Sequence, residues 1–132
     1  MNIDAKYINS IGMILTGCDS ILEHPDWSSF AVVFDINEGH MASSGFIYVN
    51  DKIIPASASF ANLGDKKALS NKIREFQQAV FEACGHKFVQ LLIQMNSAGK
   101  IHIDFEFDNP KRWNMGPANY RAMREQLRPA FD

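Results

Sequence analysis

The chain has 132 residues, 46% of them hydrophobic, so a domain of this size can bury roughly two-thirds of its unfolded surface and fold alone. With 13 Lys and Arg against 15 Asp and Glu, its formal net charge of -2 argues against a dedicated nucleic-acid or membrane-surface binder. Ten Phe, three Tyr and two Trp argue against disorder, and two Cys exclude a disulfide-rich secreted scaffold.

The N-terminal segment predicts a helix followed by a strand. Apolar residues recur every three or four positions through residues 1–22, which is typical of an amphipathic helix. His24-Pro25-Asp26 ends that helix, because the residue before a proline disfavours helical geometry. From Trp27 the apolar period becomes two, and residues 30–37 therefore predict a strand.

Two further strands are expected before the second helix. The Gly-Ser stretch from Gly39 to Gly45 is expected to be a loop that leads into a strand, Phe46–Val49. Asn50-Asp51 is a plausible tight turn into a third strand, Lys52–Ser59. Pro55 marks that strand as an edge or a bulge, because proline cannot donate a ladder hydrogen bond.

A second helix is expected from an N-cap at Asp65 to a left-handed stop at Gly85. Five residues line its apolar face: Leu69, Ile73, Phe76, Val80 and Cys84. Two strands follow, Lys87–Met95 and Lys100–Phe107, joined by a hairpin loop over residues 96–99. After a loop, Pro117 opens a short third helix that Pro129 closes, and this helix contains Tyr120, Met123 and Leu127.

The predicted fold is therefore a single α+β domain over residues 1–132, with the order α-βββ-α-ββ-α. Most connections are too short for parallel crossovers. We expect a largely antiparallel sheet with the helices packed on one face.

Motifs that carry chemistry are missing from the sequence. Cys18 and Cys84 both fall on apolar helix stripes, where a thiol is expected to pack in the core. The four histidines show no metal-ligand spacing, and no phosphate-binding loop, dinucleotide fingerprint or serine nucleophile motif is present. We therefore predict no catalytic residue, no metal and no cofactor.

One strand gathers charged residues on a single face. His102, Asp104, Glu106 and Asp108 alternate with apolar residues, so their side chains should project together, roughly 7 Å apart. Three interpretations stay open: a solvated outer face, a carboxylate or His-carboxylate site for a metal or acid-base step, and an acidic surface that docks on a basic partner.

The segment after Asn109 is basic. Arg124 and Arg128 are expected to interact with the dipole of the last helix, and the other basic residues can pair with the acidic strand. The basic residues of this segment are Lys111, Arg112, Arg121, Arg124 and Arg128. Trp113 is either a lid over the core or an exposed interface anchor, and its burial distinguishes the two.

The run from Gly99 to Asp108, followed by Asn109-Pro110-Lys111-Arg112-Trp113, resembles the YezG-like immunity proteins of bacterial polymorphic and contact-dependent toxin systems. In that family a hairpin turn leads into a strand of alternating aromatic and acidic residues, then a polar break and a C-terminal helix. The order of elements is similar across nearly the whole chain. The Gly39–Gly45 loop and Pro55 depart from the family pattern.

The resemblance implies an antitoxin that binds and neutralises a cognate bacterial toxin by protein–protein occlusion, with no catalytic residues of its own. The toxin would be a nuclease domain at the C-terminus of a large polypeptide. By position, Asp104, Glu106, Asp108 and Trp113 match the family pattern and are the expected partner-binding residues.

Two other functions remain open. The Phe residues could line a space between sheet and helices, as in a small-molecule or peptide-binding adaptor. A hydrolase would use His102 with Asp104 or Glu106. The N-terminus shows neither a basic signal-peptide region nor a long apolar stretch, so we expect a cytoplasmic protein with no membrane or direct nucleic-acid contact.

Overall fold

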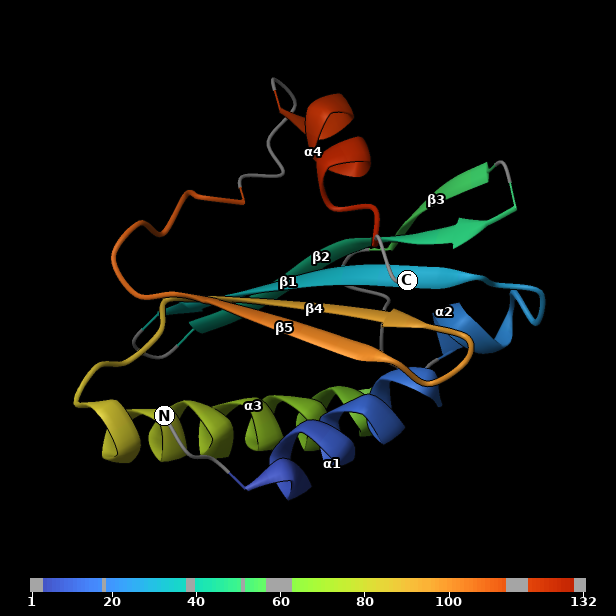
Figure 1. Cartoon of the computed structure of the whole chain (residues 1–132). Coiled ribbons are helices and arrows are strands. Elements are labelled where there is room, and N and C mark those ends of the chain that lie inside the picture. Colours follow the sequence, from blue (N-terminus) through green and yellow to red (C-terminus); the bar gives the residue numbers. More distant parts are fainter. Residues whose placement is uncertain are drawn as a thin grey trace.

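The computed structural model describes residues 4–17, 19–37, 40–50, 52–56, 63–113 and 119–129. It confirms the α+β class and the predicted order α-βββ-α-ββ-α, with one additional short helix, α2, after the first (Figure 1). The helices and strands are α1 (Ala5–Thr16), α2 (Asp19–Leu22), β1 (Ser29–Asn37), β2 (His40–Val49), β3 (Lys52–Ala56), α3 (Leu63–Cys84), β4 (Gln90–Asn96), β5 (Ile101–Glu106) and α4 (Tyr120–Gln126).

The five strands form one sheet in the order β3-β2-β1-β4-β5, and every neighbouring pair is antiparallel, as predicted. β1 lies at the centre, and β3 and β5 form the two edges. The predicted edge position of the strand that contains Pro55 is confirmed.

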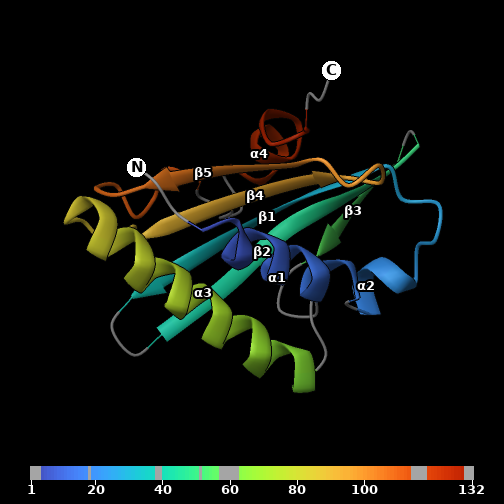
Figure 2. The ribbon, with the colours of Figure 1, turned by 60° about the horizontal axis from the view of Figure 1, so that its bottom comes forward.

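Helices α1 and α3 cover one face of the sheet (Figure 2). Phe30, Val32 and Phe34 of β1 point to this face and are at most 2% exposed. Two residues of α1 and four of α3 close the core from the other side: Ile11, Leu15, Leu69, Ile73, Phe76 and Val80. Burial of this apolar face supplies the main driving force for folding.

The second face of the sheet is also covered, and here the expectation that all helices lie on one face is wrong. α4 packs on the side opposite α1 and α3 (Figure 1), because the intervening positions of β1 and β2 are apolar as well. A sheet that is apolar on both sides needs cover on both. This smaller core contains Ala31, Val33, Phe46, Tyr48, Leu92, Trp113, Met123 and Leu127.

Two side chains from the sheet hold α4 at its C-terminal carbonyls. The hydroxyl of Tyr48 donates to the carbonyl of Arg124 at 2.7 Å, and Nε2 of Gln94 donates to the carbonyl of Leu127 at 2.8 Å. Burial raises the pKa of Tyr48, so the phenol keeps the proton that it donates. A helix of only seven residues depends on such tertiary contacts.

The predicted helix over residues 1–22 is divided in two. α1 ends at Thr16, where the N–H of Gly17 bonds the carbonyls of Met13 and Ile14. α2 begins at Asp19, and Cys18 lies outside the described residues.

The Gly-Ser stretch predicted as a loop is a strand from His40 onward, so β2 is longer than expected. Position 45 requires a glycine, because a Cβ there would lie 2.1 Å from the carbonyl oxygen of Ala31. Asn50 has a φ of 55°, as the predicted turn requires. The end of the predicted third strand, residues 57–59, lies outside the described residues.

Helix α3 begins at Leu63, so Asp65 lies within the helix and the predicted N-cap there is wrong. Gly85 has a φ of 82° and ends the helix as predicted. Cys84 is exposed, with Sγ 3.6 Å from the carbonyl oxygen of His86, and its predicted place in the core is wrong. The buried face of α3 stops one turn earlier, at Val80.

The C-terminal elements are close to those predicted. β4 and β5 are each slightly shorter than expected, and Gly99 has a φ of 92° in the loop between them. α4 begins at Tyr120, and Pro117 lies outside the described residues. None of the helices in the described ranges has the length and apolar character needed to cross a bilayer.

Candidate partner-binding surface

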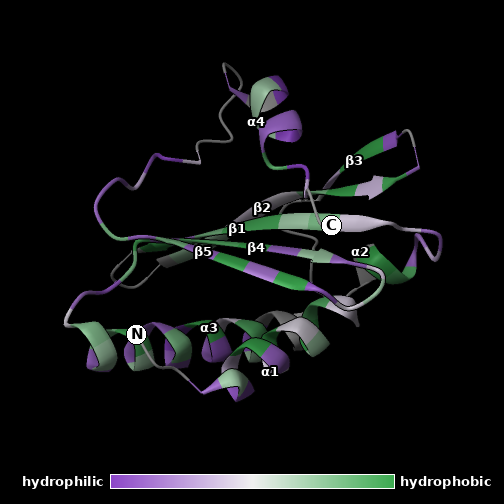
Figure 3. Cartoon of the chain, viewed as in Figure 1, coloured by the Kyte–Doolittle hydropathy of each residue, from purple (hydrophilic) through white to green (hydrophobic). Residues whose placement is uncertain are grey.

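The predicted charged row lies on β5, which alternates hydrophobic and hydrophilic residues (Figure 3). His102, Asp104 and Glu106 stand opposite Gln94, Leu92 and Gln90 of β4, on the face of the sheet that α4 covers. The strand ends at Glu106, so Asp108 follows in a bend and the expected four-residue row on one strand is wrong for Asp108.

Arg112 joins two of these carboxylates. Its Nη1 lies 3.2 Å from Oε1 of Glu106, and its Nη2 lies 3.5 Å from Oδ2 of Asp104. The pairing expected between the basic C-terminal segment and the acidic strand is thus confirmed for Arg112. The surface is therefore mixed in charge, with two carboxylates sharing one guanidinium.

Glu106 also holds the loop that follows the strand. Its Oε2 accepts hydrogen bonds from the backbone N–H groups of Asp108 and Asn109, both at 3.0 Å. The N–H of Asn109, then that of Asp108, and then Arg112 lower the pKa of Glu106 below its ordinary value. Glu106 consequently remains a carboxylate and fixes the path of the chain toward Arg112.

Trp113 is buried, at 3% exposed, in the core under α4. The lid interpretation is therefore confirmed, and Trp113 as an exposed interface anchor is wrong. Its backbone N–H donates to Oε1 of Gln90 at 3.1 Å, and Nε2 of Gln90 donates to Oδ1 of Asp35 at 2.6 Å. The guanidinium carbon of Arg112 lies 4.5 Å from the centre of the Trp113 ring, a cation–π contact that orients Arg112.

Sequence reasoning did not locate Gln90, which is buried at 1% exposed on β4. A glutamine in an apolar strand was the available signal, because a buried amide needs partners. Gln90 supports the whole surface, since it fixes the backbone at Trp113 and hence the residue before it, Arg112.

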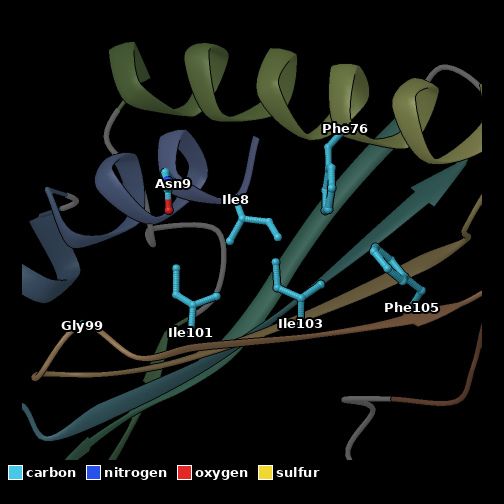
Figure 4. A pocket seen from close by; sticks show the side chains of 7 residues that line it. All are labelled: Ile8, Asn9, Phe76, Gly99, Ile101, Ile103 and Phe105. Atoms are coloured by element: carbon cyan, nitrogen blue, oxygen red, sulfur yellow. The ribbon is translucent and has the colours of Figure 1, made fainter. Parts of the chain in front are cut away.

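A cleft of about 570 Å³ lies on the other face, between α1, α3 and β5 (Figure 4). This cleft lies between the sheet and the helices, where a ligand space was predicted, and it is located at the edge of the sheet formed by β5. Gly12 lets α1 approach β5 here, because a Cβ on it would lie 2.7 Å from Cδ1 of Ile101. The cleft is lined by Ile8, Asn9, Phe76, Gly99, Ile101, Ile103 and Phe105.

Within the part of the chain that the structure describes, no three His, Cys, Asp or Glu residues are placed to hold a metal ion together. Sequence comparison finds no family model that matches the chain and no curated protein that matches it.

Proposed function

We propose that this chain is an immunity protein that binds and neutralises a cognate bacterial toxin by covering part of its surface. The observation that carries the proposal is the bridge from Arg112 to Asp104 and Glu106, which holds these charged groups in place on β5. The resemblance of residues 99–113 to YezG-like immunity proteins points the same way.

Preformed charge suits a protein inhibitor. Arg112 and Asp104 are both 43% exposed, so each can contact a partner while keeping its present geometry. Side chains that are ordered before binding lose less entropy on association, and complementary charge speeds the encounter. An interface of ordinary size, about 1,600 Å² in total, is within reach of a domain of this length.

The proposed partner is a nuclease domain at the C-terminus of a large toxin. A groove that holds phosphates is basic, so carboxylates can occupy it in place of the nucleic acid. Asp104 and Asp108 are the residues that we assign to this contact, and Glu106 and Trp113 position them. We infer that the encounter takes place in the cytoplasm, with no direct contact to nucleic acid or membrane.

The test measures binding to the toxin domain encoded next to this chain. Asp104→Asn and Asp108→Asn together should slow association by about tenfold and flatten its salt dependence. Glu75→Gln on α3, which removes an exposed charge from the opposite side, is the matched control. Failure of the unaltered chain to bind that domain, or to protect cells from it, would reject the proposed function.

The cleft favours a second candidate, a small-molecule or peptide-binding adaptor. Its volume is that of a small-molecule site, and five of its seven lining residues have apolar side chains. Native mass spectrometry of the purified chain should then detect a bound molecule. Replacing Ile103 by Asp should release that molecule, whereas Asp104→Asn should not; a chain that always carries nothing argues against the adaptor.

A further inference from the structure

β5 is an edge strand, and half of its peptide groups face away from β4. The N–H of Asn96 donates to the carbonyl of Lys100 at 3.0 Å, and the N–H of Val89 donates to the carbonyl of Glu106 at 2.7 Å. Hydrogen-bonded and non-hydrogen-bonded residue pairs alternate along an antiparallel ladder. The backbone N–H and C=O groups of the even-numbered residues between these ends therefore point toward β4. The peptide groups of Ile101, Ile103 and Phe105 therefore face the open edge.

The opposite edge of the sheet is less suited to an added strand. Val49 pairs with Lys52 across a two-residue turn, which makes that pair a bonded one. By the same alternation, the peptide groups of Ile53 and Pro55 point away from β2, toward the outer edge of β3. Pro55 has no N–H to donate, a common device that protects an edge. β5 has no proline, so of the two edge strands in the described residues it is β5 that presents a full set of outward donors and acceptors.

Apolar surface lies beside the open edge. The side chains of Ile101, Ile103 and Phe105 form one wall of the cleft, and Asn9 of α1 lies on the other side (Figure 4). Met13, one helical turn after Asn9, is 76% exposed. A strand added to β5 would thus come with apolar surface to bury, in addition to its backbone hydrogen bonds.

We propose that β5 pairs antiparallel with β5 of a second copy of this chain, centred on Ile103, so that the two sheets become one. The register follows from charge. With Ile103 opposite itself, Lys100 lies opposite Glu106 of the second copy, and His102 lies opposite its Asp104. Opposite charges across strands are favourable.

The neighbouring registers are worse matched. Centring on Asp104 places two aspartates directly opposite each other, and centring on His102 places two histidines there. Asp104 and Glu106 also share the single guanidinium of Arg112, so Lys100 of the second copy brings the cation that balances their charge. The outward peptide groups match too, because Ile101 then lies opposite Phe105 in a bonded pair.

Analytical ultracentrifugation tests the association. We expect a dimer that dissociates on dilution, and amide hydrogen exchange at Ile101, Ile103 and Phe105 that slows as the dimer forms. Lys100→Glu places like charges at both symmetry-related ends and should weaken the dimer by about tenfold. Lys52→Glu makes the same charge change at an exposed residue of β3, at the opposite edge of the sheet, and should have little effect.

Single cysteines report the register. In a Cys18→Ser, Cys84→Ser background, only a residue opposite itself can form a symmetric disulfide, and directly opposed Cα atoms lie about 5.5 Å apart in a bonded pair. Ile103→Cys should cross-link faster than His102→Cys or Asp104→Cys.

Several results would overturn the pairing: a chain that stays monomeric at all concentrations, faster cross-linking at position 102 or 104, or equal effects of the two lysine reversals. Amides of β5 that become protected only when a toxin domain is added would assign the edge to a strand of that domain. The oligomeric state, the cross-linking register and the lysine reversals do not bear on whether the chain neutralises a toxin, so the two proposals fail separately.

Discussion

Gln90 links two parts of the molecule that are distant in sequence. Its amide bonds Asp35 on β1 and the backbone of Trp113 in the loop after β5, so it satisfies polar groups on both. Removing one partner of a buried hydrogen bond leaves the other unsatisfied, which costs more than the bond itself contributes.

We predict that Gln90→Leu lowers the free energy of unfolding by about 2 kcal/mol. Urea denaturation measures this change. Gln78→Leu, on the exposed side of α3, is the control and should change stability little. Similar stabilities for the two variants would show that the Gln90 contacts are not needed to hold the loop.

Glu106 should make the free energy of unfolding depend on pH in the acidic range. Its pKa is lower in the folded chain than its ordinary value of 4.5, so the unfolded chain takes up a proton first. The stabilisation from this carboxylate is complete above about pH 4.5 and is lost as the pH falls through the folded pKa.

Glu106→Gln should therefore be less stable than the unaltered chain at neutral pH, and this difference should shrink on acidification. Urea denaturation at a series of pH values between about 7 and 3 measures it. Glu75→Gln provides the comparison, because its carboxylate is exposed on α3. A difference that does not change with pH would contradict the role given to the ionised carboxylate.

Part of this surface could be predicted from the sequence. Alternation placed His102, Asp104 and Glu106 on one face, and the excess of Arg and Lys after Asn109 predicted a partner for the carboxylates. The position of Asp108 was wrong because period two continues to Asp108 in the sequence, whereas Glu106 turns the chain by accepting two backbone N–H groups. Such local bonds compete with a ladder and leave no periodic signal.

Among the elements, β2 shows how a glycine can belong to a strand. Gly45 lies opposite Val32, and the carbonyl of Ala31 fills the space where a Cβ would stand. Glycine in the interior of a strand often marks such a close backbone approach.

We predict that Gly45→Ala destabilises the chain by about 2 kcal/mol or more, because the clash is with backbone of the central strand. Thermal unfolding followed by circular dichroism gives the change in Tm. Ser44→Ala, one residue earlier in the same strand, separates the effect of the clash from that of strand propensity. A normal Tm for Gly45→Ala would mean that β1 and β2 can separate at little cost.

Most elements could be predicted from hydrophobic period and from glycine and proline positions, whereas the face of the sheet that α4 covers could not. Hydrophobic period identifies which residues are apolar but not which side of a sheet a distant helix will cover. β1 carries apolar residues at successive positions from Phe30 to Phe34, which is equally compatible with cover on one face or two. The position of α4 depends on hydrogen bonds from Tyr48 and Gln94, and no local sequence pattern predicts these long-range contacts.

At the scale of the whole molecule, stability should be graded from the centre of the sheet outward. β1 pairs with a strand on each side and is buried on both faces, whereas α4 is short and is tied by two side-chain hydrogen bonds. Regions with few buried contacts open at the lowest free energy.

Native-state hydrogen exchange should therefore be slowest in β1 and much faster in α4. Tyr48→Phe should accelerate exchange in α4 and leave β1 nearly unchanged, because it removes the bond to Arg124. Tyr7→Phe, whose ring stacks against Phe76 on the other face, is the control. Equal exchange in α4 and β1 would instead show that both faces unfold as one unit.

Burial on both faces also decides how β1 keeps its alignment. In most half-buried strands a slip of one residue is prevented by polarity, since it exposes apolar groups. From Phe30 to Phe34 such a slip would exchange apolar residues for apolar residues, so polarity opposes it only through Asp35, whose carboxylate would leave Gln90 and turn toward the helix side. Phenyl rings would have to enter space shaped for a methyl group, and the helix side would be left with voids. The alignment of the central strand is thus enforced by the sizes of its side chains from Phe30 to Phe34, together with the charge of Asp35.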